Sequence, residues 1–343
     1  MKTFVQLGFL LISGLGILGT DLETLIENEK NDLDPGDKLV ANQVNEATSD
    51  ETWEEKKKDL RKQISFYLYT KANPTDGQQL YVGDVDALKG SNFNFSRPTK
   101  FLTHGWINTV KDDAVSLIRD AYLKHGDYNI IGIDWSKISF GPYVKVSNRV
   151  LVVGKYCSSF IDFLQTQGLD LSRVAIIGHC LGGHVAGLSA RYAKGKVDRV
   201  VALDPALPHF ALTASGERCA RNDAKYVEVV HTNGGVFGFE KAIGDVDFYP
   251  NGGGLQAGCK SNTCSHLRAY KYFAESINSK VGFEAVKCPT YSDFRQGACN
   301  SNDKVFLGGP NPNNDAKGVY FFDTNEYSPF AKENSFGTRL PPS

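Results

Sequence analysis

The sequence has almost no excess of charge of either sign, because 38 Lys and Arg face 39 Asp and Glu over 343 residues. Nucleic-acid-binding domains usually carry a basic patch or stripe, so this balance gives no support to a nucleic-acid partner. No segment after residue 20 is apolar for the length that a transmembrane helix needs. No internal repeat is found. We therefore expect a globular chain with enough apolar material for a core and no transmembrane anchor.

The one long apolar run stands at the N-terminus and has the pattern of a secretory signal. Lys2 supplies a positive charge, Phe4 to Leu18 form the apolar segment, and Gly19 and Thr20 are small enough for cleavage. Residues 1–20 are therefore predicted to be a signal peptide, and the protein is predicted to be secreted and extracellular. An uncleaved anchor is the alternative that this pattern leaves open.

Cysteine and methionine usage supports that compartment. Seven Cys accompany a single Met, and several of the Cys lie close together near the C-terminus, which fits an oxidising environment. Asn94-Phe95-Ser96 is the one N-glycosylation sequon in the chain. In a secreted protein, Asn94 is expected to carry a glycan.

The composition changes near residue 60. Residues 21–60 are rich in Asp and Glu and poor in apolar side chains, so they are predicted to be a solvated N-terminal extension or propeptide with a fragment of helix. Residues 61–343 are assigned to one folded domain. Within it, predicted strands alternate with predicted helices, which requires a mainly parallel sheet with helices on both faces. The fold class is α/β, and such folds place their sites at the carboxyl ends of the strands.

These elements follow from apolar periodicity and from Gly and Pro positions. The expected strands are 64–69, 99–103, 128–135, 173–177, 197–203 and 226–231, and the expected helices are 111–125, 144–167, 180–194 and 264–277. The stretch from residue 288 to residue 343 is rich in Gly, Pro and Asn. It is expected to form loops and edge strands that close the same domain.

The stretch from Arg173 to Gly187 joins a strand, a sharp turn and a helix. Gly178 and Gly182 stand two residues before and two after Cys180, which is the G-x-S-x-G nucleophile elbow with cysteine in place of serine. Such a turn strains its central residue, and the flanking glycines avoid clashes. The elbow is predicted to display the Cys180 thiol as a nucleophile at a helix N-terminus, where negative charge is favoured.

An acid and a base follow the elbow in the order found in α/β-hydrolases. Asp204 comes directly after an apolar strand, and His266 stands where a loop enters a helix. We predict that Asp204 orients the imidazole and that His266 takes the proton of the Cys180 thiol. The backbone N–H groups of Trp106 and Leu181 are predicted to form an oxyanion hole.

Six motifs of this chain resemble an insect member of the secreted animal lipase family, which includes pancreatic lipases, phospholipases A1 of wasp venom and insect yolk proteins. The motifs are FLTHGW (101–106), NIIGIDW (129–135), GHCLGGHVAG (178–187), LDPALPHF (203–210), DVDFYPNGG (245–253) and CSHLRAYKYFAESI (264–277). The resemblance implies an α/β-hydrolase fold, catalytic roles for Cys180, Asp204 and His266, and substrates that are lipid esters. The C-terminal β-sandwich of the family is expected to be absent, because the chain ends too soon after the last motif.

The lengths of two loops narrow the class of substrates that the resemblance implies. The family closes a lid with a disulfide just before the catalytic histidine, and here Cys259 and Cys264 enclose only four residues. The segment from Asn233 to Gly244 is short as well. Both short loops resemble the phospholipase A1 branch of the family. We therefore expect an open pocket mouth at a lipid interface and weak interfacial activation.

The resemblance also implies a set of disulfides. Cys259–Cys264 and Cys288–Cys299 match pairs that the family uses. Cys157 recurs at helical spacing with apolar residues and is interpreted as a buried small side chain. Cys219 has no local partner, so a free thiol and a bridge to Cys157 both stay open.

A structural calcium ion often follows the catalytic Asp in this family. The matching stretch here keeps Asp223 but has Ala220 where an acidic ligand is expected. Hard cations need several oxygen ligands. No metal and no other cofactor is therefore expected, and the oligomeric state is left open.

The thiol at position 180 leaves two hypotheses. A helix N-terminus and a neighbouring histidine both favour a thiolate. Against this, sulfur is larger than oxygen and leaves more readily than an alkoxide, which favours activated esters, thioesters or lactones over triacylglycerol. The first hypothesis is a secreted phospholipase A1-like ester hydrolase with a Cys-Asp-His triad. The alternative is a catalytically weak or inactive homologue that binds or stores lipid, as yolk proteins do. The retained Asp204 and His266 favour the first.

Overall fold

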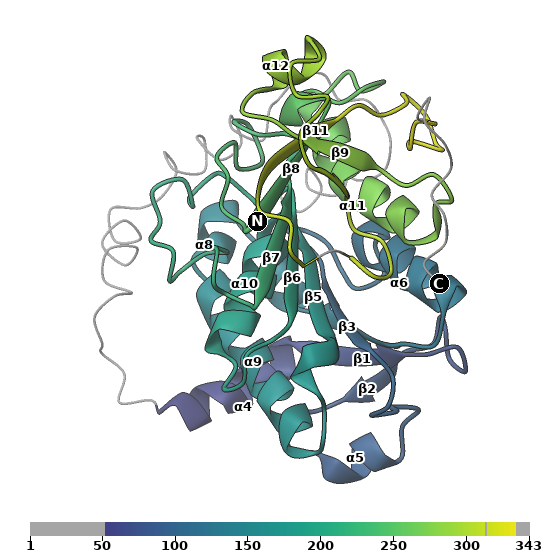
Figure 1. The fold of residues 1–343 in the computed structure, drawn as a ribbon. Helices are drawn as coiled ribbons and strands as arrows, with labels where there is room; N and C mark the ends of the chain where they lie inside the picture. Colours follow the sequence, from purple (N-terminus) through teal and green to yellow (C-terminus); the bar gives the residue numbers. More distant parts are fainter. Residues whose placement is uncertain (1–51, 313, 334–343) are drawn as a thin grey trace, which may run out of the picture.

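The computed structural model describes residues 52–312 and 314–333, so the predicted signal peptide and most of the predicted extension lie outside the described residues. The described residues include an eleven-stranded sheet in the order β10-β9-β11-β8-β7-β6-β5-β3-β4-β1-β2 (Figure 1). The strands are β1 (Ser65–Tyr69), β2 (Gln78–Leu80), β3 (Thr99–Thr103), β4 (Asn129–Asp134), β5 (Val174–His179), β6 (Arg199–Leu203), β7 (Tyr226–Val230), β8 (Val246–Pro250), β9 (Glu284–Lys287), β10 (Lys304–Phe306) and β11 (Gly318–Phe322).

Most neighbouring strands run parallel. The parallel part extends from β11 through β8, β7, β6, β5 and β3 to β4. One edge continues with β1 and β2 and the other with β9 and β10, all in antiparallel pairs. The mainly parallel sheet expected from the alternation of elements is thus confirmed.

Helices cover both faces of the sheet. The helices are α4 (Trp53–Gln63), α5 (Val85–Lys89), α6 (Asp113–His125), α7 (Ser136–Ser139), α8 (Tyr143–Ser147), α9 (Val150–Thr166), α10 (Leu181–Tyr192), α11 (Asn262–Asn278), α12 (Tyr291–Arg295) and the 3-10 turns η1 (Leu171–Arg173) and η2 (Asn251–Gly253). α9 and α10 lie on one side of the sheet and α6 and α11 on the other (Figure 1). Phe101 and Leu102 of β3 accordingly point into two different apolar clusters. The fold is the expected α/β-hydrolase fold.

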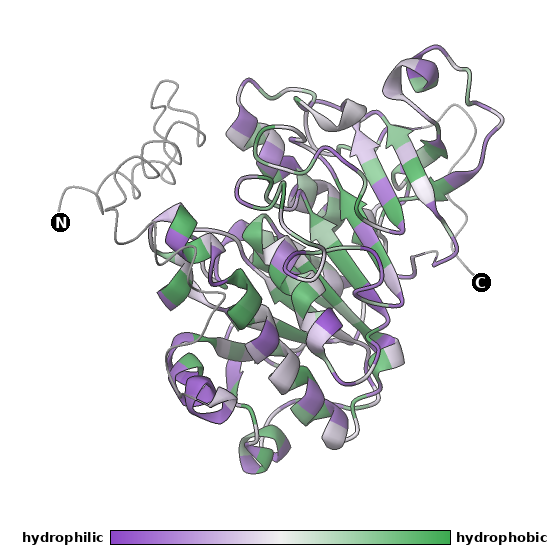
Figure 2. Ribbon diagram, turned by 90° about the vertical axis from the view of Figure 1, so that its left-hand side faces the viewer, coloured by the Kyte–Doolittle hydropathy of each residue, from purple (hydrophilic) through white to green (hydrophobic). Residues whose placement is uncertain are grey.

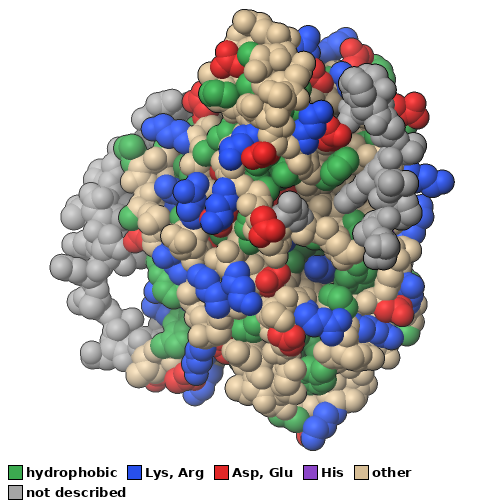
Figure 3. Space-filling view, in the orientation of Figure 1, with side chains coloured by type: hydrophobic (Ala, Val, Ile, Leu, Met, Phe, Trp, Pro, Cys, Tyr) green, Lys and Arg blue, Asp and Glu red, His purple; other side chains and the backbone are tan. Residues whose placement is uncertain are grey.

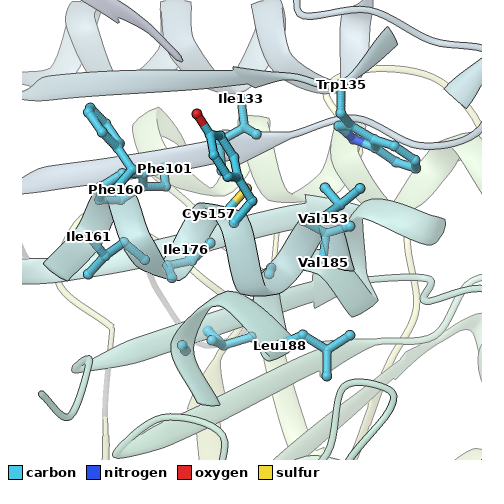
Figure 4. Close-up of a cluster of buried hydrophobic side chains, with 14 of the residues drawn as sticks. Phe101, Ile133, Trp135, Val153, Cys157, Phe160, Ile161, Ile176, Val185 and Leu188 are labelled. Atoms are coloured by element: carbon cyan, nitrogen blue, oxygen red, sulfur yellow. The ribbon is translucent and has the colours of Figure 1, made fainter. Parts of the chain in front are cut away.

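Apolar side chains from both layers meet at the sheet surface. Figure 2 shows hydrophobic colour along the central strands, whereas the helices alternate between hydrophobic and hydrophilic residues. Figure 4 shows one cluster, in which Phe160 and Cys157 of α9 approach Ile176 of β5 and Leu188 of α10. Phe160 also stacks on Phe66, with 4.0 Å between the ring centroids. Cys157 is 1% exposed, so it fills the role of a small apolar side chain.

Two predictions of elements were wrong in detail. The long helix expected over 144–167 is divided into α8 and α9, and the Ser147 hydroxyl donates to the Val144 carbonyl at the division. The C-terminal stretch was expected to supply only loops and edge strands. Instead β11 lies inside the sheet, parallel to β8 and antiparallel to β9. Its partners are distant in sequence, so periodicity alone does not reveal this position.

The last residues of the predicted extension are helical. Thr52 caps α4 in a capping box with Glu55, and Leu60 is 1% exposed. Leu60 belongs to the same apolar cluster as residues of α9. This end of the extension is therefore packed on the domain, and the boundary at residue 61 stays a prediction.

The surface carries charges of both signs. Figure 3 shows Lys and Arg side chains interspersed with Asp and Glu over the face that it draws. Such a mixed face gives little net attraction for a polyanion. Among residues 52–312 and 314–333, no helix has both the length and the apolar character that crossing a bilayer requires.

Candidate active site

Cys180 occupies the sharp turn between β5 and α10. Its backbone has φ 60° and ψ −125°, a strained conformation for a residue other than glycine. A Cβ on Gly178 would lie 2.0 Å from the carbonyl oxygen of Gly182, and a Cβ on Gly182 would lie 2.4 Å from that of His104. The turn therefore requires glycine at both flanking positions. The Cys180 thiol is free and 9% exposed.

Asp204 stands directly after β6, the strand next to the elbow strand. Its carboxylate is fully buried. Oδ1 accepts hydrogen bonds from the backbone N–H groups of Thr232, at 2.8 Å, and Asn233, at 3.0 Å. Two such donors stabilise the ionised form of a buried carboxylate. Oδ2 lies 2.5 Å from Nδ1 of His266.

His266 lies in the second turn of α11, since that helix begins at Asn262 and not at the expected residue 264. Because Nδ1 donates to Asp204, Nε2 is left for the nucleophile. Burial by itself would lower the pKa of His266. The charge of Cys180 and the hydrogen bonds to Asp204 and to Cys180 outweigh burial and raise the pKa to about 10. The structure therefore brings Cys180, Asp204 and His266 together in the core, with the imidazole between the sulfur and the carboxylate.

The two predicted oxyanion donors border the thiol. Leu181 is the first residue of α10, directly after Cys180. Trp106 follows Gly105, and a Cβ on Gly105 would lie 2.8 Å from Cβ and 3.5 Å from Sγ of Cys180. The His104 ring fixes this turn by donating from Nδ1 to the Gly105 carbonyl at 3.0 Å. Both backbone N–H groups thus belong to turns that contact the nucleophile, as an oxyanion hole requires.

Several residues of the site were not predicted. Besides the two backbone donors at Thr232 and Asn233, the Phe237 ring packs edge-on against His266 at 5.7 Å between centroids. The His179 ring lies 4.4 Å from the His266 ring and bonds to the His266 carbonyl through Nε2. These residues come just after the apolar strand β7 or at the end of β5. Their position at the carboxyl ends of predicted parallel strands is the sequence signal that could have identified them.

Four of the seven cysteines form two disulfides, and the other three are free. Cys259 is bonded to Cys264, and Cys288 is bonded to Cys299. Cys157 and Cys219 are both free and buried. The alternative of a bridge between them is therefore wrong, although both belong to the same apolar cluster.

The stretch that matches the calcium loop does not suit a metal ion. The Asp223 carboxylate accepts from the backbone N–H of Ala220 at 2.8 Å, and Arg191 lies 2.6 Å from its other oxygen. Burial raises the pKa of Asp223 to about 6, although Arg191 opposes this. Within the part of the chain that the structure describes, no group of three His, Cys, Asp or Glu side chains could hold a metal ion. An arginine stands where a cation would have to bind.

Asn94 lies on an exposed loop between α5 and β3. Its Oδ1 accepts from the backbone N–H of Ser96 at 2.9 Å and from the Ser96 hydroxyl at 2.7 Å. The side chain of Asn94 is accessible at the surface, and its glycosylation stays a prediction.

Comparison with known proteins shows which sequences this chain is similar to. The sequence pattern of the family described as Lipase matches residues 34–330. Pancreatic triacylglycerol lipase of Homo sapiens is 33% identical over 301 residues, which cover 78% of this chain and 64% of that protein. The Sus scrofa protein of the same name is 33% identical over 314 residues, 82% of this chain and 69% of that protein. Inactive pancreatic lipase-related protein 1 of Mus musculus is 35% identical over 260 residues, 68% of this chain and 55% of that protein.

The chain is shorter than the proteins that it matches. It spans 64% of the length of the human lipase and 57% of that of the Myocastor coypus lipase. The matched part nevertheless includes the elbow, Asp204 and His266, because the family pattern extends from residue 34 to residue 330.

Proposed function

This chain belongs to the lipase family, and from that membership we propose that it is a secreted carboxylic ester hydrolase that acts on lipid esters through Cys180, His266 and Asp204. The proposal includes a phospholipase A1-like substrate preference. Family membership supports a hydrolase of the lipase type, and the finer assignment comes from the site.

One observation carries the proposal. Nδ1 of His266 lies 2.5 Å from Oδ2 of Asp204, and the Cys180 sulfur raises the pKa of the His266 ring. A structural cysteine would have no need of an imidazole oriented by a buried carboxylate. The same arrangement is what an activated nucleophile requires, because the base must be held within reach of it and in the correct tautomer.

The first half-reaction forms an acyl-enzyme. The Cys180 thiolate attacks the ester carbonyl carbon, and the carbonyl oxygen becomes an oxyanion that accepts hydrogen bonds from the N–H groups of Trp106 and Leu181. The bond from carbon to the leaving oxygen then breaks. His266 gives its Nε2 proton to that oxygen, so an alcohol departs and a thioester remains. Asp204 keeps the imidazole in place while its charge changes.

The second half-reaction restores the enzyme. Neutral His266 takes a proton from a water molecule, whose oxygen attacks the thioester carbon. The same two N–H groups hold the second oxyanion. The carbon–sulfur bond breaks, and the carboxylic acid leaves with Cys180 again a thiolate beside a protonated His266.

Short loops around the site support the phospholipid preference. The disulfide joins Cys259 to Cys264, five residues further along the chain in the first turn of α11, so the loop that it closes is short. The loop between β7 and β8 is folded back on Asp204 through Thr232 and Asn233. With so little chain to form an apolar flap, a bulky headgroup can approach the thiol without a large opening movement.

The proposed compartment is extracellular. The structure has two disulfides, which persist in oxidising compartments. The N-terminal apolar run supplies a route to that compartment. Asn94 would then carry an N-linked glycan.

The test is hydrolysis of a short-chain p-nitrophenyl ester and of a phosphatidylcholine with different acyl chains at its two positions. Wild type is expected to release the sn-1 chain, and both Cys180→Ala and treatment with iodoacetamide are expected to abolish turnover. Cys157→Ala serves as the matched control, because that thiol is buried away from the site and its loss should leave turnover unchanged. Release of the sn-2 chain, or full activity in Cys180→Ala, would contradict the proposal.

A non-catalytic lipid-binding or storage protein is the second candidate. It is favoured by the cysteine at the position where the elbow pattern has serine. A matched relative also bears the name inactive pancreatic lipase-related protein 1. If wild type is silent and Cys180→Ser hydrolyses the ester, the chain is a lipase that has lost its nucleophile. If both are silent and the protein retains bound lipid, the second candidate is correct.

A further inference from the structure

A second histidine–aspartate pair lies in the core next to the proposed triad. His231 is the first residue after β7 and Asp247 is the second residue of β8, and both are fully buried. Nε2 of His231 lies 2.9 Å from Oδ1 of Asp247. Neither residue belongs to the mechanism described above. A buried pair of this kind needs an explanation, because ionisable groups in a core are destabilising unless they are paired and hydrogen-bonded.

Both nitrogens of the His231 ring face hydrogen-bond acceptors. Nδ1 lies 2.6 Å from the carbonyl oxygen of Phe239, which can only accept, so Nδ1 carries a proton. Oδ1 of Asp247 already accepts from the backbone N–H groups of Ile243 and Gly244, at 2.9 and 3.2 Å. Asp247 thus binds both the His231 ring and the end of the loop, while His231 binds the loop through Nδ1.

The surroundings of the pair contain acidic and neutral titratable groups. The Tyr249 ring stacks on the imidazole, with 4.3 Å between centroids and 7° between planes, and its hydroxyl donates to the Glu240 carbonyl. Burial raises the pKa of the Cys219 thiol, and the charge of Asp247 raises it further. Asp204 is close as well, because its Oδ1 accepts from the backbone N–H of Thr232, the residue that follows His231. The His231 ring is thus held on its face by Tyr249 and at both nitrogens by hydrogen-bond partners.

The pair holds the loop 232–244 at its middle and at its end. His231 binds the carbonyl of Phe239, and Asp247 binds the N–H groups of Ile243 and Gly244. The same loop surrounds Asp204. Its first two N–H groups bind Oδ1, and Gly238 is pressed so closely on the carboxylate that a Cβ there would lie 2.2 Å from Oδ1.

We propose that His231 and Asp247 are positioning residues, a buried hydrogen-bonded pair that fixes loop 232–244 around Asp204 and thereby sets the orientation of His266 and the reactivity of Cys180. The pair acts through the loop and does not touch the thiol. This inference deepens the proposed function, since it concerns how the same triad is held. Its content is the set of hydrogen bonds that join the pair to the loop.

The first test needs no substitution. In the full chain, the backbone N–H groups of Ile243 and Gly244 should exchange with solvent much more slowly than that of Gly216, because Asp247 accepts from both. Exchange as fast as that of Gly216 would overturn the proposal. This measurement is independent of whether the protein hydrolyses any ester.

The second test compares Asp247→Asn with Glu240→Gln. Both remove one carboxylate near the same loop, but Glu240 is exposed and does not bind His231. The rate of Cys180 alkylation by iodoacetamide, followed by mass spectrometry of its peptide, should fall about 10-fold or more in Asp247→Asn, the usual scale for losing an outer-shell partner. It should stay at the wild-type rate in Glu240→Gln. Equal alkylation rates in wild type and Asp247→Asn would refute the positioning role.

The two tests separate this inference from the proposed function. If no ester is hydrolysed but the alkylation rate depends on Asp247, the pair positions the triad of a protein that is not an ester hydrolase. If esters are hydrolysed and Asp247→Asn changes neither turnover nor alkylation, the hydrolase stands and the positioning role is refuted. Should Asp247→Asn fail to fold, the exchange rates of Ile243 and Gly244 in the wild type still decide whether Asp247 holds the loop.

Discussion

At the scale of single residues, the sulfur of Cys180 determines both the charge of its neighbour and the chemistry that is open to the site. The imidazole of His266 is buried, an environment that disfavours charge, yet its pKa is raised to about 10. Sulfur is thus as much a charge partner for His266 as Asp204 is. In the proposed mechanism the nucleophile is a thiolate before substrate arrives, whereas a serine would have to be deprotonated during the reaction.

Removal of the sulfur should therefore change the titration of the histidine. In Cys180→Ala, burial still lowers the pKa of His266 and only Asp204 raises it, so the pKa should fall below its wild-type value of about 10. Titration of the assigned ring resonance by NMR measures this. Cys157→Ala removes an equally buried thiol that does not act on His266, and it should leave the titration unchanged. An unaltered pKa in Cys180→Ala would mean that the sulfur and the ring do not interact.

At the scale of elements, the loop between β7 and β8 shapes the acid of the site. It supplies two N–H donors to Asp204 and lays the Phe237 ring against His266. Gly238 allows this approach because it has no Cβ. A short loop that is tightly bonded to the carboxylate can orient it more strictly than a long one, since fewer backbone conformations are open to it.

Gly238→Ala should misplace the acid. The added Cβ would meet Oδ1 of Asp204 at 2.2 Å, so the loop or the carboxylate must move. A displacement of about 1 Å at a catalytic group can reduce turnover about 100-fold, and we expect a loss of that order in ester hydrolysis. Gly216→Ala is the control, because its Cβ would meet nothing within 4 Å. Similar rates for the two variants would show that the loop does not restrain Asp204.

A second contact between elements joins the end of α10 to the loop after Cys219. Arg191 and Asp223 form an ion pair whose carboxylate is buried and whose guanidinium is partly exposed. Burial raises the pKa of Asp223 to about 6, above its ordinary value of 3.8. The folded chain therefore binds this proton more tightly than the unfolded chain. The contribution of Asp223 to stability is greatest at low pH and decreases as the pH rises through about 6.

Arg191→Gln should be destabilising at pH 7.5 and less so at pH 5. Without the arginine, the buried carboxylate is uncompensated at the higher pH, which costs about 3 kcal/mol in the free energy of unfolding, and it can take up a proton at the lower pH. Urea unfolding at both pH values measures the difference. Arg295→Gln breaks an exposed ion pair with Asp323 and should have a much smaller effect. Equal destabilisation of Arg191→Gln at both pH values would refute this account, as would a stability that depends on added calcium.

At the scale of the whole molecule, the parallel sheet gathers the site at one edge. Cys180, Asp204 and His231 follow the adjacent strands β5, β6 and β7, and α11 supplies His266 from the face opposite to α9 and α10. Cys180 and His266 are 9% and 7% exposed, and the Cys259–Cys264 loop beside α11 is short. We propose from that short loop that no large apolar flap has to be moved by an interface.

Hydrolysis should consequently rise smoothly with substrate concentration. With a short-chain phosphatidylcholine, we expect no sharp increase in rate as the lipid passes its critical micelle concentration. The measurement is initial rate against lipid concentration on both sides of that point. A large jump at the onset of micelles would indicate that another segment covers the thiol and is moved by the interface.

The sequence by itself determined the elbow, the order of nucleophile, acid and histidine, and the alternation of strands and helices. Each of these is a local pattern. Gly178 and Gly182 follow the elbow pattern over five residues, and apolar periodicity indicates which face of an element is buried. The motifs also predicted the family, and the match over residues 34–330 confirms that prediction.

Only the tertiary structure decided which distant residues meet. It inserted β11 between β8 and β9, left Cys157 and Cys219 unpaired, placed Arg191 against Asp223, and put His231 and Asp247 behind the acid. These contacts depend on the path of the chain through space, and no local pattern records them. Hydrogen-bond partners of a buried group are chosen by what the packed core brings within about 3 Å, and that choice is made only when the chain is folded.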